Sequence, residues 1–215
     1  MSDLRYTLLT DGSSDRVLVP LLTWLLREKN VRSAIQPQWA ELRGLPNPPR
    51  DLYERILTCI ELYPCDLLFV HRDAEREPPE ERVGEIEDAL LRGTNQGQAI
   101  PPAVCVVPVR MQEAWLLFDE AAIRQAAGNP NGQRELRLPR VTASEALPDP
   151  KEMLHGPLRA ASGLSGRRIH TFNARQAALR LADLIDDFAP LRALPAFQRL
   201  EADLGQLLVR HGWVP

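Results

Sequence analysis

A short apolar stretch that ends in an acidic turn constrains the fold of this chain more than any other feature. Tyr6–Leu9 is an apolar run bounded by turn-forming residues, and its length suits a buried β-strand better than a helix. Asp11 follows at the end of the run, and Gly12 permits a tight turn. Val17–Leu25 then repeats apolar residues at a spacing of three to four, which predicts an amphipathic helix. The stretch therefore predicts a strand, an acidic turn and a helix.

Two interpretations of this acidic turn stay open when it is considered alone. In open α/β sheets, ligands and catalytic groups lie at the carboxyl ends of the strands, which would make Asp11 functional. The alternative is that Asp11 and Asp15 only cap the helix and face the positive end of its dipole, and Ser13 or Ser14 can also serve as the cap.

Two later apolar runs also end in carboxylates. Asp66–Val70 is an almost unbroken apolar run, as in strands covered on both faces, and Asp73 and Glu75 follow it. An extended backbone would point these two carboxylates to the same side. Ala103–Val109 is a third run, and Glu113 comes after it. If these strand ends meet at one edge of a parallel sheet, the acids repel one another unless a cation lies between them.

The expected cation is Mg²⁺ or Mn²⁺, because hard divalent cations bind a few carboxylates together with waters and substrate phosphates. The residues that we expect to bind it are Asp11, Asp73 and Glu75. Glu113 is expected to complete the catalytic set or to act as a general base.

The remaining pattern predicts an α/β core followed by a helical part. A weaker strand is expected at Ser33–Trp39, and beyond Asp119 the strand signal fades. The expected organisation is an α/β core with a Rossmann-like, mainly parallel sheet flanked by helices at 1–120, with a helical extension at 121–215. Helices are predicted at Asp51–Tyr63, Pro78–Leu91, Ala177–Phe188 and Pro195–His211, with further helix starts at Asp149 and Asn173.

A basic region follows the acidic strand ends. Ala121–Arg180 contains ten Lys or Arg residues against four acids. Arginines can hold backbone phosphates while a metal ion acts on one of them, which suits a phosphodiester substrate. Scattered arginines on a solvated helical surface are the open alternative. The residues expected to contact nucleic acid are Arg110, Lys151, Arg167, Arg168 and His170.

Missing patterns argue against several other chemistries. The sequence has no HExxH, GxxxxGK[ST], GxGxxG or GxSxG motif, which disfavours a zinc protease, a P-loop ATPase and a serine hydrolase. His71, beside Asp73, suits a structural role at a strand end, with proton transfer as the alternative. Three cysteines without metal-ligand spacing predict reduced thiols in a cytoplasmic protein. Val17–Leu26 is too short to cross a bilayer, so no membrane partner is expected.

Several motifs together resemble an uncharacterised Toprim-like family. The chain contains an acid–Gly–x–Ser–Asp turn after the first strand and the acidic pair Asp73 and Glu75 after a later one. EAWLLFD at Glu113–Asp119 is the most specific motif, and DPKEML and PAFQRL follow it at Asp149–Leu154 and Pro195–Leu200. Members of the family are often encoded beside AAA- or ABC-type ATPases in phage-defence loci.

The resemblance implies a Toprim fold, as in topoisomerases, primases and overcoming-lysogenization-defect nucleases. Asp11 would take the place of the first metal-binding acid, and Asp73 and Glu75 that of the Asp–x–Asp pair. The implied function is a Mg²⁺-dependent nuclease that works with a partner ATPase, and a homo-oligomer is compatible with it. Asp11 stands where the family usually has Glu, so a catalytically silent regulatory or sensor subunit that binds a partner protein is the alternative.

Overall fold

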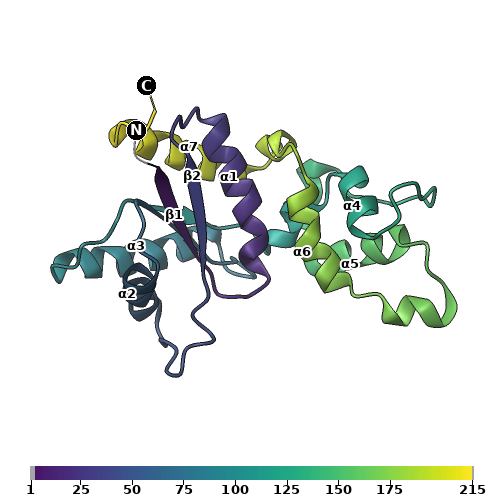
Figure 1. The fold of residues 1–215 in the computed structure, drawn as a ribbon, viewed down its shortest axis with the longest axis horizontal. Helices are drawn as coiled ribbons and strands as arrows, with labels where there is room; N and C mark the ends of the chain where they lie inside the picture. Colours follow the sequence, from purple (N-terminus) through teal and green to yellow (C-terminus); the bar gives the residue numbers. More distant parts are fainter. Residues whose placement is uncertain (1–2, 215) are drawn as a thin grey trace.

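A four-stranded, all-parallel sheet forms the centre of the α/β part of the protein (Figure 1). The computed structural model describes residues 3–214. The strand order is β2-β1-β3-β4, and every neighbouring pair is parallel, which confirms the predicted α/β fold class. The strands are β1 Leu4–Leu9, β2 Ile35–Ala40, β3 Leu67–His71 and β4 Ala103–Val106.

Helices connect the strands and make up most of the chain after β4. The α-helices are α1 Leu18–Glu28, α2 Leu52–Leu62, α3 Pro79–Asn95, α4 Glu120–Ala126, α5 Pro150–Ala161, α6 Ala174–Leu184 and α7 Pro195–Arg210. Short 3-10 turns are η1 Asp15–Val17, η2 Gln112–Leu116, η3 Val141–Ala146, η4 Gly166–Thr171 and η5 Ala189–Ala193. Within residues 3–214, no helix combines the length and the apolar character needed to cross a membrane.

Side-chain caps fix several of the predicted helix starts. Asp149 accepts a hydrogen bond from the backbone N–H of Glu152, and Asn173 accepts one from Gln176, so both predicted starts are confirmed. The serine cap predicted at the first helix is wrong. The chain enters α1 through η1, and the hydroxyl of Ser14 donates to the carboxylate of Asp15 instead of accepting a backbone N–H.

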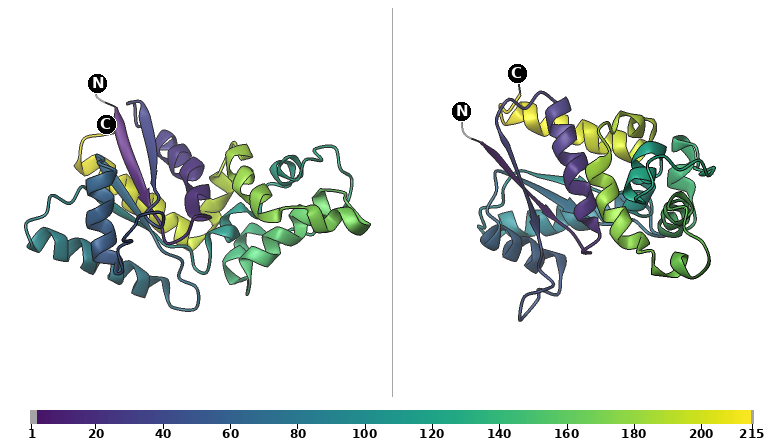
Figure 2. Two further views of the ribbon diagram at one scale, coloured as in Figure 1. Left: turned by 60° about the horizontal axis from the view of Figure 1, so that its bottom comes forward. Right: turned by 45° about the vertical axis from the view of Figure 1, so that its right-hand side comes forward.

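Helices cover both faces of the sheet, with α1 and α7 on one face and α2 and α3 on the other (Figures 1 and 2). The alternation of side chains along β3 explains this two-sided burial. Leu67 and Phe69 belong to the core under α1 and α7, whereas Leu68 and Val70 pack with α2 and α3. All four are fully buried, which is why the strand is continuously apolar in the sequence.

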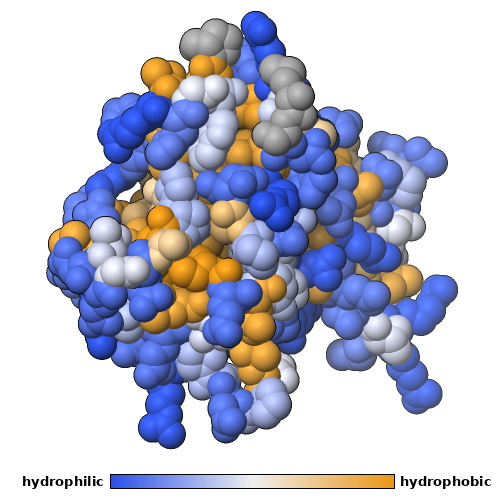
Figure 3. All heavy atoms as spheres, turned by 60° about the vertical axis from the view of Figure 1, so that its left-hand side comes forward, coloured by the Kyte–Doolittle hydropathy of each residue, from blue (hydrophilic) through white to orange (hydrophobic). Residues whose placement is uncertain are grey.

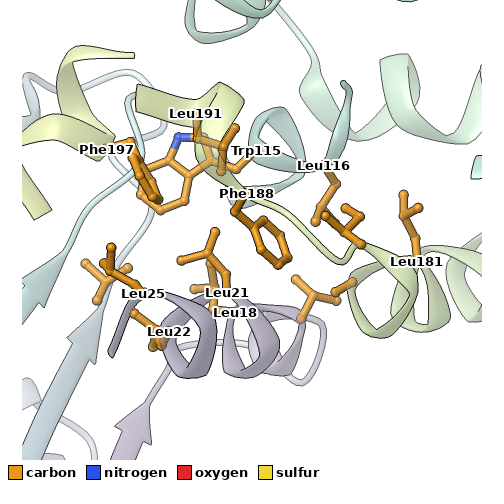
Figure 4. Close-up of a cluster of buried hydrophobic side chains, with 14 of the residues drawn as sticks. Leu18, Leu21, Leu22, Leu25, Trp115, Leu116, Leu181, Phe188, Leu191 and Phe197 are labelled. Atoms are coloured by element: carbon orange, nitrogen blue, oxygen red, sulfur yellow. The ribbon is translucent and has the colours of Figure 1, made fainter. Parts of the chain in front are cut away.

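The helices α4, α5 and α6 form a lobe beside the sheet, and α7 then returns to pack near β4 (Figure 1). The core under α1 continues without interruption into this lobe. Trp115 is fully buried and meets Phe197 of α7 edge to face, with ring centroids 5.6 Å apart (Figure 4). Trp115 is therefore a core residue, and through it the EAWLL motif joins the lobe to the sheet.

The outer surface on the side of α2 and α3 is mainly hydrophilic, with an apolar area near its centre (Figure 3). Within residues 3–214, the large apolar side chains with substantial exposure are Leu62, Leu91 and Val209. The acidic residues predicted from the strand ends lie elsewhere, at the carboxyl edge of the sheet.

Candidate functional site

A cleft of about 310 Å³ lies between the carboxyl edge of the sheet and the helical lobe. In the sheet, β1 lies between β2 and β3, and the chain that leaves β1 continues to β2. The cleft opens beside the carboxyl end of β1, where ligands bind in open α/β sheets. The acidic residues that line it are Asp11, Asp15, Asp73 and Glu113. Its basic residues are Arg43, Lys151, His155 and Arg175. Lys151 and His155 come from α5, and Arg175 comes from α6.

Asp15 is buried at the floor of this cleft. One carboxylate oxygen accepts the N–H of Gly12 at 2.6 Å, and the other accepts the Ser14 hydroxyl and the side-chain amide of Gln112, both at 3.0 Å. A Cβ at Gly12 would come within 2.9 Å of the Asp15 carboxylate, so a larger residue there would force this carboxylate to shift. The turn after β1 therefore fixes Asp15 rather than Asp11 at the centre of the cleft.

Asp73 lies on the next strand end and faces the same acidic cluster. Its carboxylate accepts the backbone N–H of Gln112 at 3.0 Å. Burial, followed by the charges of Asp15 and Glu113, raises the pKa of Asp73 to about 8. Gln112 thus binds two carboxylates, Asp73 through its backbone and Asp15 through its side chain, and η2 holds the two strand ends together.

Glu113 is the third acid of the cluster and is buried, like Asp15. Its side chain projects from η2, and its Oε2 atom is buried without a hydrogen-bond partner in the described residues. Burial raises the pKa of Glu113, and the nearby charge of Lys151 only partly opposes this effect. An unpartnered carboxylate oxygen inside the protein is costly, so this atom needs a proton or a cation.

His71 lies beneath the acids and is also almost fully buried. Its Nδ1 is 2.9 Å from the carbonyl oxygen of Val106 and therefore donates its proton to that oxygen. The Nε2 atom lies 3.5 Å from Asp73 and 3.8 Å from Asp15, with no hydrogen-bond partner. Burial lowers the pKa of His71, so the neutral ring presents a lone pair to the acids. A proton on Asp73 relieves this contact, in agreement with the raised pKa of that carboxyl group.

Asp11 also lines the cleft, but its carboxylate pairs with two arginines. Arg55 of α2 hydrogen-bonds one oxygen, and the Nε of Arg72 lies 3.2 Å from the other. Burial alone would raise the pKa of Asp11, but these two guanidinium groups outweigh it and lower the pKa. Arg72 also binds Glu85 of α3. Asp11 is therefore part of an ion-pair network at the rim of the cleft.

The expected pairing of Asp73 and Glu75 on one side of an extended strand is wrong. The strand β3 ends at His71, before either acid, and Glu75 adopts a left-handed backbone conformation with φ of 55°. Its side chain is exposed and lines a neighbouring hollow of about 460 Å³, whereas Asp73 lines the cleft. The positive φ rotates Glu75 out of the register that an extended backbone would have given it.

The chemistry of the buried acids suits a hard divalent cation, although the side chains as they stand do not form a closed metal site. Within residues 3–214, no three His, Cys, Asp or Glu side chains are grouped so that they could hold a metal ion. Asp15, Asp73 and Glu113 nevertheless offer oxygen donors in one cleft, one of them without a partner. Crowded carboxylates of this kind bind a cation or retain protons.

The structure separates the residues expected to contact nucleic acid into three places. Lys151 lines the cleft, and Arg110 lines the adjoining hollow that contains Glu75. The η4 residues Arg167, Arg168 and His170 are exposed and are not among the residues that line the cleft.

Several residues of the cleft were not assigned to the site from the sequence. Asp15 was assigned to capping, and Gln112, His155 and Arg175 were not singled out. Arg175 donates to the hydroxyl of Ser13 at 2.8 Å, a contact between residues 162 positions apart. No local sequence pattern signals a contact of that range. For the buried Asp15, the available sequence signal was that a second aspartate follows Asp11 four residues later.

Comparisons of the chain with models of protein families, with curated proteins and with solved structures found no match.

Proposed function

We propose that this protein is a Mg²⁺- or Mn²⁺-dependent phosphodiester hydrolase, a nuclease subunit that acts in the cytoplasm with a separate ATPase. One observation carries the proposal. Two buried acids, Asp15 and Glu113, and the partly buried Asp73 line a cleft that also bears several cationic side chains. Acids suit the metal ion, and cations on the rim suit the phosphates of a substrate that the acids alone would repel.

The residues that would hold the ion are Asp15, Asp73 and Glu113, whose side chains would have to move closer together, because as they stand no three acids in residues 3–214 are grouped for a metal ion. When bound, a divalent ion polarises a phosphoryl oxygen and lowers the pKa of a water molecule. This set differs from the one expected from the resemblance. The negative charge of Asp11 is already balanced by two arginines, and Glu75 lines another hollow.

The chain's own side chains supply the remaining chemistry. Lys151 and Arg175 hold phosphate groups on either side of the scissile bond, because both line the cleft and neither forms an ion pair in the described part of the chain. The Oε2 of Glu113 is free to accept a proton from the attacking water. The neutral ring of His71 lies beneath Asp73, with Nε2 3.5 Å from its carboxyl group, and a bound cation would take the place of the proton on Asp73.

The ATPase partner and the role in phage defence rest on the resemblance to the Toprim-like family. The sequence contains no phosphate-binding glycine loop of its own, so ATP hydrolysis would have to come from a second protein.

The test is hydrolysis of labelled DNA and RNA with Mg²⁺ or Mn²⁺, in the presence and absence of the neighbouring ATPase. Asp73→Asn and Glu113→Gln should abolish cleavage, because each keeps the shape of the side chain and removes its charge. The matched control is Asp88→Asn, which removes an exposed carboxylate on α3 and should cleave normally. Cleavage unchanged in both cluster variants would disprove the assignment.

A second candidate function is a catalytically silent subunit that binds a partner protein. The neutralisation of Asp11 by Arg55 and Arg72 favours it, because this is the position of the first metal-binding acid in the Toprim resemblance. Calorimetry separates the two functions. Heat of Mn²⁺ binding that Asp73→Asn removes supports the hydrolase, whereas no Mn²⁺ binding together with a stable complex with the ATPase supports the silent subunit.

A further inference from the structure

A second hollow of about 200 Å³ adjoins the cleft on the side of β2. It lies between the carboxyl ends of β1 and β2 and the segment that leads into α2. The two cavities share Asp11, Gly12 and Arg43, so they are separated only by the turn after β1. A chain-like ligand that passes over the acids can therefore continue into the second hollow.

The aromatic wall of this hollow is the half-buried Trp39 at the end of β2. Its indole N–H donates to the hydroxyl of Thr10 at 3.0 Å, and that hydroxyl donates to the carbonyl oxygen of Gly12 at 2.9 Å. These two hydrogen bonds fix the ring relative to the turn that bears the acidic cluster. A rigid aromatic ring costs little ordering entropy when a base stacks on it.

The hollow also has cationic side chains free for a ligand. Arg43 and Arg50 are exposed, and neither side chain forms an ion pair with any residue in 3–214. Arg55 is already bound to Asp11. The one other acid of the lining, Glu41, accepts the backbone N–H of Arg43 at 2.9 Å. Two unpaired guanidinium groups beside an aromatic ring are a suitable site for a base and its phosphate.

We propose that the hollow formed by Trp39, Arg43 and Arg50 is a nucleotide subsite for the unit next to the scissile phosphate of a single-stranded polynucleotide. This inference rests on the proposed function of the acidic cleft and names its substrate class. A base that stacks on a concave aromatic wall must be unpaired, since a duplex keeps its bases stacked on one another. Arg43, which lines both cavities, would hold the phosphate between the two units.

Binding is tested with a fluorescent single-stranded oligonucleotide and the inactive Asp73→Asn protein, by anisotropy over a range of salt concentrations. Arg50→Ala should weaken binding and reduce the slope of log K against log salt by about 0.7, the value for one phosphate contact with a single strand. Trp39→Leu should weaken binding about tenfold with an unchanged slope, because it removes stacking and no charge. Trp39→Phe should restore most of the loss.

The matched control is Arg32→Ala. It removes an exposed arginine near the opposite end of β2, also without an ion pair in the described residues. Binding should stay within about twofold of the parent, since only nonspecific attraction is lost. Thermal unfolding of each variant checks that the fold is intact, and if Trp39→Leu does not fold, the comparison of Arg50→Ala with Arg32→Ala decides the test.

Hydrolysis separates failure of the subsite from failure of the proposed function. Arg50→Ala in the otherwise wild-type protein should reduce cleavage of the oligonucleotide but leave hydrolysis of bis-p-nitrophenyl phosphate, a diester too small to reach the hollow, unchanged. If neither substrate is cleaved by the wild type but the binding differences persist, the subsite stands and the hydrolase does not. Equal binding by wild type, Arg50→Ala and Trp39→Leu, or equal losses in Arg50→Ala and Arg32→Ala, would overturn the subsite.

Discussion

Replacing Asp73 with asparagine tests the electrostatic state of the acidic cluster without changing its shape. The asparagine carbonyl can still accept the N–H of Gln112, but the side chain cannot ionise. In the wild type, burial and the charges of Asp15 and Glu113 raise the pKa of Asp73 from 3.8 to about 8. Between these two pH values, the folded chain therefore retains a proton that the unfolded chain has released.

The sign and size of the effect follow from proton linkage. Because the folded state binds more protons, the stability due to Asp73 is fully present below about pH 4 and is lost as the pH rises through about 8. Where the folded state binds one more proton than the unfolded state, each pH unit lowers the free energy of unfolding by about 1.4 kcal/mol. The free energy of unfolding should therefore fall by about 4 kcal/mol between about pH 5 and pH 8. This fall is a large part of the roughly 5–15 kcal/mol that a typical domain has as its free energy of unfolding.

The assay is urea unfolding of both proteins at several pH values in the presence of a chelator. Asp73→Asn should lack this one-proton slope and should be more stable than the wild type at about pH 8. The control variant Asp88→Asn should follow the wild-type profile. Parallel pH profiles for the wild type and Asp73→Asn, or a lower stability of Asp73→Asn at high pH, would refute the assignment of a protonated Asp73.

The other variants test separate parts of the structure. Glu113→Gln should abolish hydrolysis and, because burial raises the pKa of Glu113, should increase the urea midpoint of the metal-free protein at neutral pH. Arg175→Ala should raise KM for a polynucleotide about tenfold with an unchanged Tm, since it removes one exposed phosphate contact. Trp115→Ala should cost about 3–5 kcal/mol in urea unfolding, and a loss below about 1 kcal/mol would contradict its core role. Arg55→Ala should cost up to about 1 kcal/mol more at neutral than at acidic pH, because protonation of the partly exposed Asp11 leaves only the hydrogen bond of Arg55 to the carbonyl oxygen of Thr10 to be lost.

The sheet could be predicted because each strand carries its own local signal. Leu67–Val70 is apolar throughout because both faces of the strand are covered, and Tyr6–Leu9 is followed by turn-forming residues. The pairing order of the strands and the return of α7 to the sheet depend on long-range packing, which no single segment reveals.

The candidate site was predicted only in part, for reasons visible at particular residues. Asp73 and Glu113 lie where strand ends were expected to bring acids together. Glu75 does not, because the strand ends early and a left-handed residue changes the direction of its side chain. Asp15 was assigned to capping because nothing in the sequence shows that Gly12 and Gln112 bind its carboxylate.

The central claim is that Asp15, Asp73 and Glu113 together bind a divalent cation. The most direct test is a crystal structure of the wild-type protein grown with Mn²⁺, with anomalous diffraction used to locate the ion. The account predicts an anomalous peak in the cleft, bound by carboxylate oxygens of these three residues and absent in Asp73→Asn. A peak between Asp11 and Glu75, or no peak in the cleft of a crystal soaked to saturation, would contradict it.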